Sequence, residues 1–139
     1  MTTVDVMNSI TGKAVSKTDP FPVSFSTLLC SWTGYAYSTG TGNTLYTPAA
    51  GKKFALLGFL IIVPPGTTTA VGQTIYLRDN ATVLFIGPTV PAAADAVGAI
   101  VSVSLSAPVI SSTAANPLIA TIGTAPSKSI AYTAWGYDI

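Results

Sequence analysis

Nucleophilic side chains are abundant in this chain of 139 residues, but the groups that would activate them are scarce. The sequence contains 20 Thr, 13 Ser and one Cys, and it has no His and no Glu. A Ser, Thr or Cys nucleophile needs a neighbouring base, which is most often an imidazole. The lack of His also excludes a His-containing metal site, and Cys30 has no second Cys to pair with. We therefore expect no enzymatic activity, no metal and no cofactor.

Carboxylates are the other candidates for chemistry, and all of them are aspartates. Asp79 and Asp95 are the only pair that we can place face to face, as a glycosidase requires. Together with Asn80 they are also an alternative Ca²⁺ site, although no loop has dense acidic spacing. Both residues lie in segments rich in turn formers, where Asp usually bonds to nearby backbone. We favour this structural role.

Aromatic side chains form two groups that could contact a ligand. Trp32, Tyr35 and Tyr37 are close together near the start of the strand-rich region, and Trp135 and Tyr137 share one face of the last predicted strand. Because aromatic rings stack on sugars, Trp32, Tyr35 and Tyr37 are candidate glycan contacts. Tyr and Trp serve more often as core residues or interface anchors, and we favour that interpretation.

Short strands are the elements that must position these groups. Ile100–Ser106 alternates apolar residues with serines, which predicts a strand with one wet face. Phe54–Val63 is apolar throughout, as expected of a central strand covered on both sides. Clusters of Gly, Pro and Asn separate further predicted strands at Thr44–Thr47, Gln73–Arg78, Thr82–Ile86, Leu118–Ile122 and Ser129–Tyr137. About eight such strands predict an all-β fold, an antiparallel β-sandwich of the jelly-roll type.

The first 28 residues differ from the rest of the chain. The sequence Asp-Pro-Phe-Pro-Val at positions 19–23 favours extended backbone, because alternate prolines fix the chain and remove amide donors. We expect an extended N-terminal arm at 1–28 and a sandwich domain at 29–139. The predicted core consists of Phe54, Leu56, Leu60, Ile62, Ile75, Leu77, Val83, Phe85, Val101, Val103, Leu105, Ile119, Ile130 and Trp135.

Charge is unusually scarce. Charged residues make up 8% of the sequence, where an ordinary domain has roughly a quarter, and the net charge is +1. Six scattered cations do not form a basic face, so we expect no nucleic-acid partner. We expect no secretion signal and no membrane segment, because the N-terminus carries Asp5 and the apolar run Phe54–Val63 has half the length of a span. So few charged residues are typical of a protein whose surface is permanently packed into an assembly, because a free monomer of this composition would tend to associate.

Three segments of the predicted sandwich and one segment of the arm carry a resemblance to a known class of proteins. NTLYTPAAGKKF (Asn43–Phe54) is similar to the turn that leads into an apolar strand in small β-sandwich virion proteins of tailed bacteriophages. TIYLRDNATVLF (Thr74–Phe85) resembles their hairpin, and IAYTAWGYDI (Ile130–Ile139) resembles their final strand. The preceding GKAVSKTDPFPV (Gly12–Val23) looks like the linker before such domains.

The resemblance implies a structural component of a virion, made in the host cytoplasm and located on the capsid surface. It implies a capsid decoration (cement) protein or a head or tail fibre domain, often a homotrimer. We favour the cement protein, which stabilises the shell by bridging subunits of the major capsid protein. Arm residues would then supply a strand or apolar anchors to a neighbour, namely Val4, Val6, Ile10, Phe21, Val23 and Phe25. Two alternatives stay open: a fibre or receptor-binding module that contacts a host glycan, and a self-polymerising filament subunit.

Overall fold

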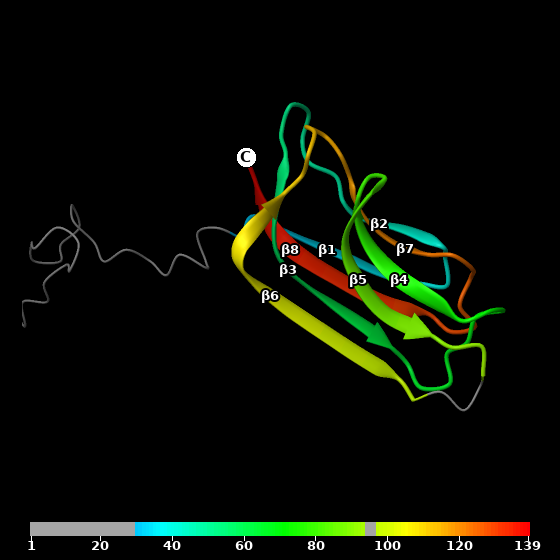
Figure 1. Ribbon diagram of the computed structural model, residues 1–139. Helices are drawn as coiled ribbons and strands as arrows, with labels where there is room; N and C mark the ends of the chain where they lie inside the picture. The colour runs from blue at the N-terminus through cyan, green and yellow to red at the C-terminus, as the bar shows by residue number, and fades with distance from the viewer. Residues whose placement is uncertain (1–29, 94–96) are drawn as a thin grey trace, which may run out of the picture.

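Residues 30–93 and 97–139 are described by a computed structural model, and every regular element in them is a β-strand. The strands are β1 (Trp32–Ser38), β2 (Gly42–Tyr46), β3 (Phe54–Val63), β4 (Gln73–Asp79), β5 (Thr82–Val90), β6 (Ala99–Ile110), β7 (Leu118–Ile122) and β8 (Ile130–Asp138). They form two layers (Figure 1). This part of the chain contains no helix long and apolar enough to cross a bilayer. The predicted arm, 1–28, lies outside the described residues.

The strands pair in a nested order. One four-stranded sheet has the order β1-β8-β3-β6, which we call the first sheet, and the other has the order β2-β7-β4-β5, the second sheet. All pairings are antiparallel. They are also nested: the first strand pairs with the last, the second with the seventh, the third with the sixth and the fourth with the fifth. The predicted antiparallel β-sandwich is confirmed. The nested order agrees with the predicted jelly roll, which stays a prediction.

Most strands match their predicted positions. The bounds of β3 and β7 are those expected, whereas β6 continues beyond Ser106 to Ile110. The sequence analysis did not single out β1, because Gly34 interrupts its run of Thr, Tyr and Trp. The structure explains this glycine: a Cβ at position 34 would overlap the carbonyl group of Leu45 on β2.

A β-bulge in β3 decides which residues enter the core. The pairing of β3 with both neighbours shifts between Leu56 and Gly58. One extra residue reverses the inward and outward alternation of the strand. Beyond the bulge the core therefore receives Phe59, Ile61 and Val63, and the prediction of Leu60 and Ile62 as core residues is wrong.

Of the other predicted core residues, three are wrong and the rest are confirmed. Trp135, Ile119 and Val83 were predicted to be buried, but Trp135 and Ile119 are only half-buried and Val83 is exposed. In β8 the core receives Tyr132 and Ala134 instead. The remaining predicted residues are confirmed as buried or as packed against the core: Phe54, Leu56, Ile75, Leu77, Phe85, Val101, Val103, Leu105 and Ile130.

Asp79 fixes one end of the sandwich. It is buried at the end of β4, where Oδ2 accepts a hydrogen bond from the Ser112 backbone N–H at 2.6 Å and Oδ1 accepts one from Asn116 Nδ2 at 2.9 Å. Beside it, the Asn80 N–H donates to the Pro117 carbonyl at 3.0 Å. These bonds attach the β4–β5 hairpin to the loop between β6 and β7. Asp79 has the structural role that we favoured, although its partners belong to a distant loop and not to its own turn.

Replacing Asp79 should test this attachment. Asp79→Ala is expected to lower the free energy of unfolding by about 2–3 kcal/mol, because two hydrogen bonds to a carboxylate are lost and the Ser112 N–H is left without its partner. Asp79→Asn should cost less, since an amide oxygen still accepts one of these bonds. Urea denaturation measures both, with Thr82→Ala in the same hairpin as control. Equal stability of Asp79→Ala and the control would contradict the assignment.

Candidate functional site

The outer face of the first sheet is the main candidate site. The strand register places its side chains in three rows that cross all four strands. In strand order β1, β8, β3 and β6, the rows are Tyr37–Ala131–Ile62–Ile100, Tyr35–Thr133–Leu60–Ser102 and Thr33–Trp135–Gly58–Ser104. None of these side chains is charged. We call these residues the uncharged face.

The uncharged face combines apolar side chains with a few hydroxyl groups, and its apolar side chains at the sheet edges are exposed. Tyr35 is 63% exposed, Tyr37 is 62% exposed and Ile100 is 73% exposed, while Leu60 and Ile62 lie half-buried between them. The sequence predicts that β3 is covered on both sides, but the other sheet covers only one of its faces. Contiguous exposed apolar surface of this kind is typical of interaction sites.

Trp135 lies in the third row of this face, with its indole ring over Gly58. A Cβ at Gly58 would overlap the indole ring of Trp135 and the carbonyl of Val103, so only glycine leaves room for the ring against the strand. Trp135 is also the cross-strand neighbour of Thr33, one position diagonal to Tyr35. The sequence analysis placed both Ile130 and Trp135 in the core, but β8 alternates regularly, so these two residues, at odd spacing, lie on opposite faces of the strand.

Trp32 is separated from the two exposed tyrosines. It points into the sandwich, is 8% exposed, and stacks on Tyr46 with ring centroids 4.1 Å apart and ring planes 8° from parallel. Tyr46 in turn donates a hydrogen bond from its hydroxyl to Oδ1 of Asp138 on β8 at 2.8 Å. The structure thus brings Tyr35 and Tyr37 together on the uncharged face and places Trp32 in the core.

The hydroxyl groups of the half-buried Tyr46 and the buried Tyr132 are hard to ionise. Partial burial is the largest cause that raises the pKa of Tyr46 to about 12, and the hydrogen bond to Asp138 and its negative charge act in the same direction. Burial raises the pKa of Tyr132 to about 12. The Tyr132 hydroxyl is buried without a hydrogen-bond partner among the described residues.

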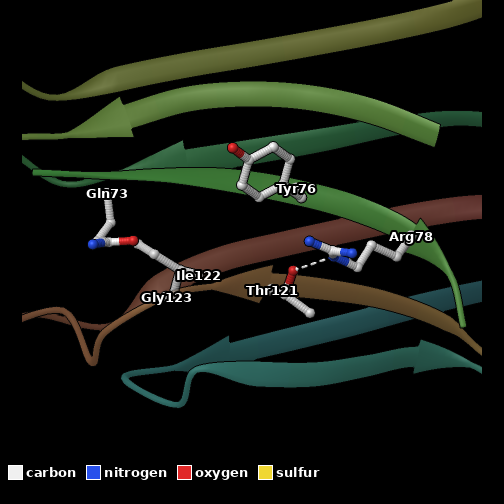
Figure 2. Close-up of a pocket in the computed structure, with 6 residues that line it drawn as sticks. All are labelled: Gln73, Tyr76, Arg78, Thr121, Ile122 and Gly123. Atoms are coloured by element: carbon white, nitrogen blue, oxygen red, sulfur yellow. Dashed lines mark hydrogen bonds between the residues drawn. The ribbon is translucent and has the colours of Figure 1, made fainter. Parts of the chain in front are cut away.

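A second site is a hollow on the outer face of the second sheet, with a volume of about 290 Å³. Its lining residues are Gln73, Tyr76, Arg78, Thr121, Ile122 and Gly123. Figure 2 shows Gln73 and Arg78 at opposite ends of the hollow, with Tyr76 between them on β4. Tyr76 and Thr121 are cross-strand partners, and Arg78 Nε donates to the Thr121 hydroxyl at 2.9 Å. A cation, an aromatic ring and a side-chain amide thus line the same hollow.

The remaining predicted site residues fall into two groups. The arm residues Val4, Val6, Ile10, Phe21, Val23 and Phe25 lie outside the described residues, as does Asp95. Both oxygens of Asp79 accept bonds from Ser112 and Asn116, as described above. Within residues 30–93 and 97–139, no three His, Cys, Asp or Glu side chains gather into a group that could hold a metal ion.

Comparisons with known proteins leave the chain without an assigned relative. No protein-family model, curated protein or solved structure matches it significantly.

Alkaline pH should destabilise the fold through Tyr46 and Tyr132. A pKa that folding raises from about 10 to about 12 adds stability that is complete below pH 10 and is lost as the pH rises toward 12. The free energy of unfolding, measured by urea denaturation, should therefore fall between pH 10 and pH 12. Tyr46→Phe should lower it by about 1 kcal/mol at pH 8, because a hydrogen bond to a carboxylate is lost, and should make the alkaline decrease smaller.

Tyr132→Phe is the matched variant for this measurement. It removes a buried hydroxyl that has no partner in the described part of the chain, so the stability at pH 8 should stay constant or rise. The double variant with Tyr46→Phe should show the smallest decrease between pH 10 and pH 12. An alkaline decrease of the same size in all four proteins would contradict the role of these hydroxyls.

Proposed function

We propose that the protein is a structural component of a bacteriophage virion, a capsid decoration (cement) protein that bridges subunits of the major capsid protein. The observation that carries the proposal is the uncharged face, which crosses a whole four-stranded sheet without a charged side chain. The resemblance of the three sequence segments to phage sandwich proteins supports the same conclusion. The protein would act on the outside of the shell, by binding alone.

The energetics favour an extended partner over a small ligand. The uncharged face combines exposed tyrosines and isoleucine with serine and threonine hydroxyls, a mixture of apolar and polar groups that suits a protein interface. Each apolar side chain that a partner covers contributes up to about 1.5–3 kcal/mol. Several copies of the protein on one symmetric shell would gain further through avidity.

The predicted arm and trimer complete the proposal. In a cement protein the sandwich would form the homotrimer and residues 1–28 would reach a capsid subunit. The two alternatives differ in where the contacts lie. A fibre module would use Tyr35 and Tyr37, now with Trp135 in place of Trp32, to stack on a host glycan. A filament subunit would use its arm to bind the next copy, which gives open growth instead of a fixed mass.

Light scattering on two proteins separates the cement and filament functions. The full chain is expected to have the fixed mass of a trimer, and a chain that begins at Leu29 should keep this mass, because the sandwich makes the trimer contacts. Mass that rises with concentration for the full chain, and falls to the monomer value after truncation, would favour the filament and contradict the cement proposal.

Charge placed on the uncharged face should prevent binding to the shell. Tyr35→Lys with Tyr37→Lys is expected to weaken co-sedimentation with shells of the major capsid protein by about 10-fold or more, because two aromatic anchors are replaced by cations that must be desolvated. Thr44→Lys with Thr89→Lys is the matched control, since it adds the same charge at exposed positions of the second sheet. Equal binding of both double variants would contradict the use of this face.

A further inference from the structure

Arg78 is a positioned cation whose hydrogen bonds go to neutral oxygens. Its Nε donates to the Thr121 hydroxyl at 2.9 Å and its Nη1 donates to the Ala81 carbonyl at 3.0 Å. The two acids that the structure describes bind elsewhere, Asp79 to the β6–β7 loop and Asp138 to Tyr46. A guanidinium has five N–H donors, so these two bonds leave further donors at the edge of the hollow, and no carboxylate within residues 30–93 and 97–139 pairs with the charge.

The other walls of the hollow are suited to a sugar ring. The guanidinium carbon of Arg78 lies 5.2 Å from the centre of the Tyr76 ring, which holds the cation beside an aromatic surface. At the opposite end, Gln73 Nε2 donates to the Val71 carbonyl at 3.2 Å, and its Oε1 lies against Gly123. A Cβ at position 123 would overlap this oxygen, so only glycine at this position leaves room for the Gln73 side-chain amide.

We propose that this hollow binds a monosaccharide that carries a carboxylate, such as a uronic acid residue at the end of a glycan. The carboxylate would accept hydrogen bonds from the free N–H groups of Arg78, for which a planar guanidinium fork is well matched. The ring would lie against Tyr76, with its hydroxyls in reach of Gln73 and Thr121. A volume of about 290 Å³ is at the lower end for small-molecule sites and suits a single ring.

This inference is independent of the proposed capsid contact. The hollow lies on the second sheet, while the uncharged face lies on the first sheet, on the opposite side of the sandwich (Figures 1 and 2). A virion protein that grips the shell with one face would present the other to the surroundings. A variant can therefore lose binding to the shell and keep binding of the saccharide, or the reverse.

Calorimetric titration of the full chain with two methyl glycosides tests the proposal. Methyl glucuronide is expected to bind saturably, and methyl glucoside, which differs in the carboxylate, should bind at least about 10-fold more weakly. Arg78→Gln should weaken glucuronide binding by about 10- to 100-fold. The glucuronide affinity of Arg78→Lys should lie between those of the unmodified chain and Arg78→Gln, because lysine keeps the charge and lacks the planar guanidinium fork. Gly123→Ala, which leaves Arg78 intact, should weaken binding several-fold by displacing Gln73.

Control variants and ligands distinguish unfolding, loss of the saccharide site and loss of the contact on the first sheet. Thermal unfolding confirms that the Arg78 and Gly123 variants are folded, and Tyr35→Lys with Tyr37→Lys should bind the glucuronide as the unmodified chain does. Equal affinity for glucuronide and glucoside would overturn the role of the carboxylate. Inorganic phosphate bound as tightly as the glucuronide would overturn the saccharide assignment in favour of a simple anion site. Unchanged binding by the Arg78→Gln variant would overturn the site itself.

Discussion

The faces of the first sheet depend on one extra residue in β3. Before the bulge Phe54 and Leu56 point into the sandwich, and after it Phe59, Ile61 and Val63 do. Without the bulge, the far half of this strand would bury the opposite set of side chains, since a shift of one residue exchanges the two faces of a strand. The bulge also sets Gly58 opposite Trp135, where the glycine leaves room for the indole on the outer face. The uncharged face is thus a consequence of how β3 is paired.

The two carboxylates in the described part of the chain hold the sandwich together at different places. Asp138 on β8 accepts a bond from Tyr46 on β2, which joins the two sheets. Asp79 on β4 binds the loop that follows β6 and leads to β7. Buried or half-buried polar groups need such partners, because an unmade hydrogen bond in the interior is costly. One result is that both described carboxylates are engaged away from Arg78, whose own hydrogen bonds go to neutral oxygens.

The sandwich consequently presents two outer faces of different chemistry. The first sheet offers an aromatic and aliphatic surface without charge, which suits a broad protein contact. The second sheet offers a small hollow with one oriented guanidinium, which suits a single charged ring. An antiparallel sheet alternates its side chains between core and outside, so one short domain can carry both surfaces on a common core.

The sequence by itself determined the all-β class, the sandwich and most strand positions, because alternation in Ile100–Ser106 and turn residues between apolar runs are local signals. It also placed Trp135 and Tyr137 on one face of the last strand. Only the tertiary structure decided which face that is, since a run such as Phe54–Val63 is apolar on both sides and hides its bulge. In β1 plain alternation separates Trp32 from Tyr35 and Tyr37, and the packing of the second sheet decided that Trp32 is on the buried side. The hollow around Arg78 joins residues from β4 and β7 that are more than forty positions apart, and only strand pairing brings them together.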